Sequence, residues 1–399
     1  MIQQINDSTN KRLNMPTFKL SFQSKLPKLE TSIFSVMSGL ATKEKALNLS
    51  QGFPNFESDS KLIELVNKAM INGKNQYAPM PGILSLREAI ALKMFNLYGV
   101  SYNPETEITI TAGATQAIFT AIAAVVKKDD EVIIFKPAYD CYEPSVELFG
   151  GKTISVQLNP EDFNIDWEKV KGLITDKTKM IIINSPHNPS GRILSKADML
   201  QLEALLKNTN ILLLSDEVYE HIIFDGEKHQ SAALFSALAE RTFITASFGK
   251  TFHNTGWKVG YCIAPVYLTE EFRKVHQFNV FSVNHPTQVA LAEYLRNSNN
   301  YLELGSFYQQ KRDLFLSLLK DSRFDFKPST GTYFQLLNFS KITDESDVDF
   351  AIRLTKEQKI ASIPISVFNE AGLDTKVLRF CFAKTDETLK KAAEVLCAI

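Results

Sequence analysis

The segment Ser247–Thr251 contains the side chain with the clearest chemical potential, the amine of Lys250. It follows Phe243–Ala246, an apolar run that predicts a buried strand. A lysine at the end of such a strand can attack a carbonyl carbon once burial has lowered the pKa of its amine. The Gly-Lys-Thr triplet also resembles the end of a nucleotide-binding P-loop, but that loop requires a glycine where Ile244 stands. We therefore expect Lys250 to be a nucleophile toward a carbonyl group and not a nucleotide ligand.

Two further segments place a carboxylate and an amide after predicted strands. The run Ile211–Ser215 is followed by Asp216, and a carboxylate that a strand end buries requires a cation or several hydrogen-bond donors. Tyr219 can face the same side if a helical turn follows. The run Met180–Asn184 is followed by a turn with two prolines, in which the Asn188 amide can donate to a ring oxygen. Taken separately, an N-capping aspartate and an ordinary rigid turn explain these segments equally well.

A third set of residues suits a phosphate group. After the expected strand Ile108–Thr111, Ala114 and Thr115 open a helix, and small residues there let backbone N–H groups approach an anion. An ordinary helix start with small residues is the alternative. Ser247 and Lys258 add a hydroxyl and a cation, both of which suit phosphate.

One ligand uses all of these groups. Pyridoxal 5′-phosphate (PLP) has a phosphate, an aromatic ring with a basic nitrogen and an oxygen, and an aldehyde for a lysine. Each segment by itself is weak evidence. Together they predict PLP, because each follows a strand and ligands of open α/β sheets bind beyond the carboxyl ends of the strands.

The elements that must position these residues alternate between apolar strands and helices from about residue 107 to 264. The apolar runs are continuous, which indicates a mostly parallel sheet covered by helices on both faces, and so the α/β class. Strands are expected at 108–111, 132–135, 153–158, 180–184, 211–215, 243–246 and 259–264, and helices at 115–126 and 196–206.

After about Pro286 longer helical patterns dominate. Helices are expected at 288–295, 305–319, 347–357 and 386–397, and strands at 333–337, 360–364 and 377–382. We therefore predict a large PLP-binding domain of residues 48–290 and a small α+β domain of residues 291–399. Residues 1–47 are too few for a core of their own, and we expect them to join the small domain as an N-terminal arm.

The composition excludes several classes of protein. The 399 residues contain 44 lysines and arginines and 45 aspartates and glutamates, so no basic surface for nucleic acid or an anionic membrane is expected. No apolar run approaches the length of a membrane span. The four cysteines and six histidines have neither disulfide-framework nor metal-ligand spacing. No secretory signal is evident, so we expect a cytoplasmic protein with free thiols and no metal.

From about Asn48 to the C-terminus the chain resembles the class I, fold-type I PLP-dependent aminotransferases. It is most similar to the methionine, kynurenine and glutamine aminotransferase branch, and 249–265 resembles the bacterial methionine aminotransferases especially. The matching motifs are Gly52-Phe53-Pro54, Gln76-Tyr77-Ala78-Pro79, 185–191, 216–219, 247–250 and Leu378-Arg379-Phe380-Cys381.

The resemblance implies a role for each matching residue. Lys250 bonds to the cofactor aldehyde and moves the substrate proton, and Asp216 pairs with the ring nitrogen. The other residues implied to contact PLP are Ala114, Thr115, Tyr139, Asn188, Tyr219, Ser247 and Lys258. Arg379 is implied to clamp the substrate carboxylate near Gly52. Tyr77 is implied to reach across from a second subunit, so that the site lies at a homodimer interface.

One departure from the family pattern bears on the substrate. Aspartate aminotransferases use a second arginine for the side-chain carboxylate, but Val275–Leu295 contains no lysine or arginine. A second carboxylate would therefore remain unpaired, and we expect a neutral side chain that faces Phe53, Tyr77 and Phe281. Kynurenine-type relatives often have a histidine where Asn284 stands, which favours methionine-like or glutamine-like substrates.

The implied reaction is ping-pong transamination between an amino acid and a 2-oxo acid. The nearest alternative is a PLP-dependent β-lyase that cleaves cystathionine or cysteine conjugates, since it uses the same fold and nearly the same residues. A regulatory protein with an aminotransferase-like domain is a more distant alternative. It would need a DNA-binding domain, and residues 1–47 contain no basic recognition helix.

Overall fold

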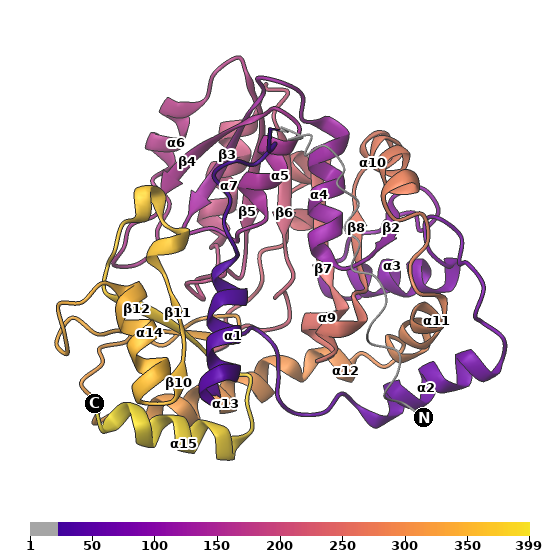
Figure 1. Ribbon diagram of the computed structural model, residues 1–399. Coiled ribbons are helices and arrows are strands. Elements are labelled where there is room, and N and C mark those ends of the chain that lie inside the picture. Colours follow the sequence, from indigo (N-terminus) through magenta and orange to yellow (C-terminus); the bar gives the residue numbers. More distant parts are fainter. Residues whose placement is uncertain (1–22) are drawn as a thin grey trace, which may run out of the picture.

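The predicted alternation of strands and helices forms a seven-stranded sheet in the computed structural model, which describes residues 23–399 (Figure 1). The strands in spatial order are β2 (Ile108–Thr111), β8 (Gly260–Ile263), β7 (Thr242–Ser247), β6 (Leu212–Asp216), β5 (Thr178–Asn184), β3 (Glu131–Lys136) and β4 (Lys152–Gln157). β8 is antiparallel to both of its neighbours, and the other strands run parallel to one another. The prediction of a mostly parallel sheet is confirmed.

The central strands are largely apolar because helices cover both faces of the sheet. In β5, Ile181 and Ile183 belong to one apolar cluster, whereas Met180 and Ile182 belong to a second cluster on the opposite face. The second cluster lies under α4 (Ala114–Val125), α5 (Tyr142–Leu148) and α10 (Val266–Asn279). The first lies under α3 (Leu84–Tyr98), α6 (Trp167–Leu173), α7 (Lys196–Leu206) and α11 (His285–Tyr294). The fold is therefore a three-layer α/β architecture.

Four further helices surround this sheet or connect its strands. They are α2 (Ser60–Ile71), α8 (Ser236–Ala239), α9 (Phe248–Thr251) and α12 (Asn299–Leu302). α11 packs against α2 and α3 at the β2 end of the sheet. Of the described helices, none combines the length and apolarity that crossing a membrane requires. The cytoplasmic location stays a prediction.

The C-terminal part of the chain forms a smaller α+β layer beside the sheet. β11 (Ile363–Pro364), β12 (Val377–Cys381) and β9 (Phe334–Asn338) form an antiparallel sheet. The helices here are α13 (Leu304–Leu318), α14 (Asp347–Glu357) and α15 (Asp386–Cys397). The chain before the large sheet joins this layer, because α1 (Ile33–Glu44) packs on α14 and β1 (Leu47–Asn48) pairs with β10 (Ile360–Ala361). Residues 1–22 of the predicted arm lie outside the described residues, and the domain division stays a prediction.

One predicted strand is wrong. The expected strand 360–364 divides at Ser362 into β10 and β11, which belong to different sheets. The apolar run is continuous because both halves are buried, so hydrophobicity alone does not show the division.

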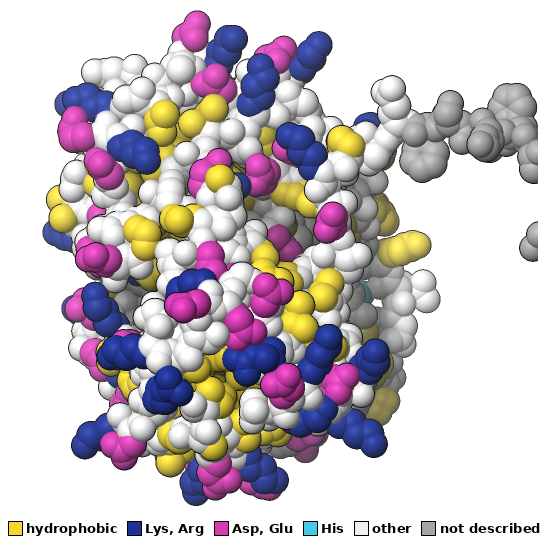
Figure 2. Space-filling view, turned by 60° about the vertical axis from the view of Figure 1, so that its left-hand side comes forward, with side chains coloured by type: hydrophobic (Ala, Val, Ile, Leu, Met, Phe, Trp, Pro, Cys, Tyr) yellow, Lys and Arg dark blue, Asp and Glu magenta, His cyan; other side chains and the backbone are white. Residues whose placement is uncertain are grey.

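Several helix boundaries agree with the prediction because a capping side chain precedes each helix. Ser195 and Asp198 form a capping box at the start of α7. The hydroxyls of Ser346 and Thr385 accept N–H groups in the first turns of α14 and α15. Over the face formed by the C-terminal layer, charged side chains of both signs are interspersed (Figure 2).

Candidate active site

The carboxyl ends of the central strands open into a cavity of about 260 Å³. Asp216 ends β6, Ser247 ends β7, and Ala114 begins the helix that follows β2. The cavity is lined by most of the site residues predicted from the sequence: Gly52, Ala114, Thr115, Tyr139, Asn188, Asp216, Tyr219, Ser247, Lys250, Lys258 and Arg379. Residues as far apart in sequence as Gly52 and Arg379 thus meet at one edge of the sheet, where open α/β folds bind ligands.

Asp216 is buried and lines this cavity. The Tyr142 hydroxyl donates to Asp216 Oδ2 at 2.6 Å, and the Val218 N–H donates to Oδ1 at 3.3 Å. Burial raises the pKa of Asp216 to about 6, although these two hydrogen bonds act in the opposite direction. A carboxylate with so few donors is stabilised by a cationic group placed next to it.

The Lys250 amine projects into the cavity from α9. Its Nζ donates to the Gly52 carbonyl oxygen at 3.0 Å and lies 5.8 Å and 5.6 Å from the ring centroids of Tyr219 and Tyr333. Burial lowers the pKa of Lys250 to about 8. The amine is therefore closer to its neutral, nucleophilic form than an exposed lysine.

Backbone groups and a cation converge where a phosphate was predicted. Gly113 has a φ of 78°, and a Cβ there would meet Lys258 Nζ at 3.3 Å. A Cβ at Gly260 would lie 2.5 Å from the Ala246 carbonyl oxygen and 3.0 Å from the Ala114 nitrogen. Only glycine permits this close approach of β8 to the start of α4. The result is a helix N-terminus with Lys258 beside it, which suits an anion.

Arg379 forms the opposite wall of the cavity and is almost fully buried. Its Nη1 donates to Asn188 Oδ1 at 2.7 Å, and its Nη2 donates to the Ser50 carbonyl oxygen at 2.9 Å. The guanidinium carbon lies 3.9 Å from the ring centroid of Phe334 and 5.1 Å from that of Phe34. Arg379 Nε has no hydrogen-bond partner among the described residues. A buried cation held in this way, with a donor to spare, suits the carboxylate of a ligand.

Four predicted residues lie away from this cavity in the single chain. Tyr77 is 82% exposed, and its ring packs against the ring of Phe281 at a centroid distance of 5.5 Å. Phe53 is partly exposed beneath the Lys384 amine. Asn284 caps α11, where its Oδ1 accepts from the Thr287 N–H and hydroxyl.

Other residues contribute to the site without having been predicted. They are Phe34, Gln51, Tyr142, Asn184, Tyr333 and Phe334. Asn184 ends β5, donates to the Asp216 carbonyl oxygen at 2.9 Å and accepts from the Asn188 N–H at 2.8 Å. The position of Asn184 at a strand end is the signal that could have identified it. Phe34 carries no such signal, because it lies on a helix far away in the sequence.

Comparisons with known proteins agree with this site. The family model "Aminotransferase class I and II" matches residues 44–396. The chain belongs to this family. It is 47% identical to methionine aminotransferase of Escherichia coli (strain K12) over 94% of this chain and 97% of that protein. It is 35% identical to kynurenine–oxoglutarate transaminase of Dictyostelium discoideum over 98% of both proteins.

The fold is also similar to those of solved aminotransferase structures. The crystal structure of YbdL from Escherichia coli, described as having a methionine aminotransferase function, matches with a TM-score of 0.92 and 46% identity. The match covers 95% of this aminotransferase and all of that chain. The predictions of a fold-type I architecture, of an aminotransferase and of PLP as its cofactor are confirmed.

The cavity of this aminotransferase fits PLP in its own residues. Gly113, at the start of α4, and Gly260, at the start of β8, let the backbone at this helix N-terminus lie close to Lys258, which suits the phosphate. The underpaired carboxylate of Asp216 suits a protonated ring nitrogen, and Lys250 provides an amine for the aldehyde. The described residues contain no group of three or more metal-ligating side chains.

Proposed function

We propose that this aminotransferase transfers the amino group of a neutral L-amino acid to a 2-oxo acid by a ping-pong mechanism. The donors are methionine-like, glutamine-like or aromatic. One observation carries this proposal: the only cations among the described residues that line the cavity are Lys250, Lys258 and Arg379. The two lysines lie where the cofactor aldehyde and phosphate are expected, which leaves one guanidinium for the α-carboxylate. A side-chain carboxylate would be buried without a partner.

The roles of the residues around the cofactor follow from their positions. PLP, when bound, supplies an electrophilic aldehyde and a ring that takes up electrons from the substrate. Asp216 would hold the ring nitrogen in its protonated form. Lys250, with its lowered pKa, would bond to the aldehyde and, once released, move the proton at the substrate Cα. Tyr219, whose ring centroid lies 5.8 Å from this amine, would donate its hydroxyl to the ring oxygen.

The remaining cofactor contacts divide between the phosphate and the ring. The residues proposed to hold the phosphate are Ala114 and Thr115 at the start of α4, Ser247 at the end of β7, and Lys258 shortly before β8. Tyr139 would stack on the ring, and its hydroxyl already lies 3.3 Å from Thr115 Oγ1. Asn188 engages Arg379 through Oδ1, so its amide N–H groups are left for the ring oxygen.

Arg379 orients the substrate. Because Asn188 and Ser50 hold two of its nitrogens, the guanidinium plane is fixed, and a carboxylate bound to it is fixed in turn. This orientation decides which bond at Cα can break. The substrate side chain would then face the rings of Phe34 and Phe334, which supports an apolar or aromatic donor.

We also propose a homodimer in which Tyr77, Phe281 and Phe53 complete the site of the second copy. Large apolar side chains are also exposed close in sequence to the two residues of the Tyr77–Phe281 contact: Ile71 is 84% exposed and Phe278 is 87% exposed. An exposed apolar surface of this kind marks a protein interface. Analytical ultracentrifugation tests the assembly, and a monomer at micromolar concentration would contradict it.

A panel of amino donors tests the substrate proposal. Methionine, glutamine, phenylalanine, leucine, kynurenine and aspartate are each paired with the same 2-oxo acid, and kcat/KM is compared. We expect the neutral donors to exceed aspartate by at least about 100-fold, since an unpaired buried charge costs about 3 kcal/mol or more. Strong aspartate activity would overturn the proposal. Stoichiometric pyruvate from cystathionine without a 2-oxo acid would favour the β-lyase alternative.

A further inference from the structure

Side chains from one segment, residues 276–288, hold the backbone of the loop that carries Tyr77. The carbonyl oxygen of Met80 accepts from His276 Nε2 at 3.2 Å, and that of Ala78 accepts from Ser282 Oγ at 2.9 Å. The contacts at the two ends of the loop are His285 Nδ1 with the Gln76 carbonyl oxygen at 3.0 Å and Gln288 Oε1 with the Ile83 N–H at 2.9 Å. An exposed loop is thus fixed along its length from one side.

His276 connects this loop to the phosphate end of the cavity. The Ala112 N–H donates to Gln116 Oε1 at 3.0 Å, and Gln116 Nε2 lies 3.1 Å from His276 Nδ1. The carbonyl oxygen of Met80 can only accept, so His276 Nε2 carries the hydrogen and Nδ1 accepts from the Gln116 amide. Burial lowers the pKa of His276 to about 4, in keeping with this neutral ring. The chain of donors therefore runs in one direction, from Ala112 to Met80.

We propose that His276 is a positioning residue that couples the phosphate cradle of one subunit to the Tyr77 loop, which serves the active site of the second subunit. The inference rests on the proposed dimer, in which Tyr77 completes that site. His276 is fully buried and does not line the cavity, so it acts through Gln116 and Met80 and not by contact with the cofactor.

The physical basis is the cost of leaving this chain of hydrogen bonds incomplete. Without the imidazole, the Met80 carbonyl oxygen and one amide hydrogen of Gln116 lose their partners, because Gln116 Nε2 keeps only Thr120 Oγ1 at 2.6 Å. Such groups move to find other partners. The loop then loses its central contact, and Tyr77 is placed less well.

Hybrid dimers test the coupling. Two differently tagged chains are produced together, and one of them carries Lys250→Ala. Only the other subunit then binds PLP covalently, so PLP absorbance and transamination report on a single site. His276→Phe, which keeps a ring but removes both contacts, is placed on the chain with Lys250→Ala. We expect the affinity of the intact site for PLP to fall about tenfold, as for the loss of one good hydrogen bond.

Several further variants are placed on the Lys250→Ala chain of the hybrid dimer to make the test more specific. His276→Gln keeps a donor and an acceptor, and we expect it to restore part of the affinity. Thr269→Val removes another buried hydrogen bond of α10, from Thr269 Oγ1 to the Ala264 carbonyl oxygen, and is expected to leave the affinity unchanged. Ser282→Ala removes a neighbouring contact at a half-buried position. If His276→Phe does not fold, Ser282→Ala is expected to show the same effect at a smaller size.

The outcomes distinguish the two proposals. The coupling would be overturned by two results together. In the first, His276→Phe weakens PLP binding only when it is on the chain with the intact Lys250. In the second, Ser282→Ala on the Lys250→Ala chain has no effect. Tyr77→Phe serves as the reference. If Tyr77→Phe on the Lys250→Ala chain weakens PLP binding and His276→Phe does not, only the coupling is wrong. If Tyr77→Phe on that chain has no effect, the proposed dimeric site is wrong, and the coupling is wrong with it.

Discussion

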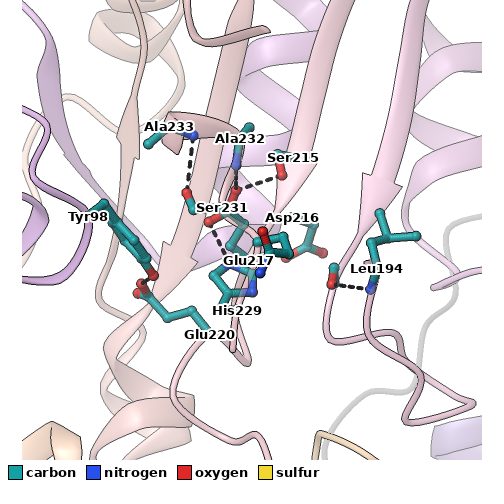
Figure 3. A network of polar contacts seen from close by, with 12 residues as sticks. Tyr98, Leu194, Ser215, Asp216, Glu217, Glu220, His229, Ser231, Ala232 and Ala233 are labelled. Carbon is teal, nitrogen blue, oxygen red and sulfur yellow. Dashed lines mark hydrogen bonds and ion pairs between the residues drawn. The ribbon is translucent and has the colours of Figure 1, made fainter. Parts of the chain in front are cut away.

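Two consecutive carboxylates at the end of β6, Asp216 and Glu217, are both buried but differ in their hydrogen bonds, and Figure 3 shows those of Glu217. Asp216 receives one short hydrogen bond, from Tyr142, and one long one. Glu217 receives three: from Ser215 Oγ at 2.8 Å, from the Ala232 N–H at 3.0 Å and from His229 Nε2 at 2.8 Å. The first carboxylate has acceptor capacity left for a ligand, and the second is satisfied within the chain.

Glu220, one turn further along the chain, resembles Glu217. It forms an ion pair with Lys93 and accepts from the hydroxyls of Tyr98 at 2.9 Å and Tyr261 at 3.0 Å. Burial alone would raise the pKa of Glu220, but the Lys93 ammonium holds it below its ordinary value. Burial of a carboxylate therefore does not identify a functional one. The number of donors that the fold itself provides separates the ligand-binding acid from the structural acids.

The largest effect on stability is expected at the ion pair between Lys93 and Glu220. Glu220→Gln leaves the Lys93 ammonium, 3% exposed, without a charged partner, and we expect the free energy of unfolding to fall by about 3–5 kcal/mol. Urea denaturation of the PLP-bound enzyme measures this. The double variant Lys93→Met, Glu220→Gln is expected to recover part of the loss, because no unpaired charge remains. An unchanged unfolding midpoint for Glu220→Gln would show that the pair does not stabilise the fold.

At Asp216, the carboxylate with acceptor capacity left for a ligand, the main effect is expected on catalysis and not on stability. Asp216→Asn cannot stabilise a positive charge on the ring nitrogen, and we expect kcat to fall by about 10²–10³-fold, in the range known for loss of one electrostatic group. Glu217→Gln is the matched control, with kcat within about threefold of wild type and a lower stability. Steady-state kinetics and thermal denaturation of both variants separate the two effects. Equal losses of kcat would mean that the comparison of the two acids is wrong.

Much of the site could be predicted because its residues follow strands. Asp216, Lys250 and Asn188 each stand after an apolar run, and their types suit a single cofactor. Tyr142 and Phe34 could not be predicted, since nothing local shows that their side chains reach Asp216 and Arg379. The same reasoning explains Ser362, where a continuous apolar run conceals two strands that pair with different partners. Long-range pairing decides such features.

The raised pKa of Asp216 makes the apoenzyme sensitive to pH. The pKa is 3.8 for an ordinary aspartate and about 6 here, so the folded state binds a proton more tightly than the unfolded state. The contribution of Asp216 to the free energy of unfolding is fully present below pH 4. It is lost as the pH rises through about 6, and the loss reaches about 3 kcal/mol. Asp216→Asn should remove this loss. Between pH 4 and pH 7 the free energy of unfolding of the variant should therefore rise relative to that of the wild-type apoenzyme. Urea denaturation at several pH values measures the difference, and parallel curves would contradict it.

The smallest expected effect tests whether Glu217 is as well satisfied as its contacts indicate. Ser215→Ala removes one of the three donors, but the Ala232 N–H still donates to the same oxygen, Oε1. The free energy of unfolding should therefore fall by less than it would if the carboxylate lost all its donors. We expect a decrease of about 1–2 kcal/mol and no change in kcat. Ser306→Ala, at an exposed hydroxyl of α13, is the control and should stay within about 0.5 kcal/mol of wild type. If Ser215→Ala instead lowered kcat as Asp216→Asn does, the two neighbouring carboxylates would act as one unit, and counting donors would not distinguish them.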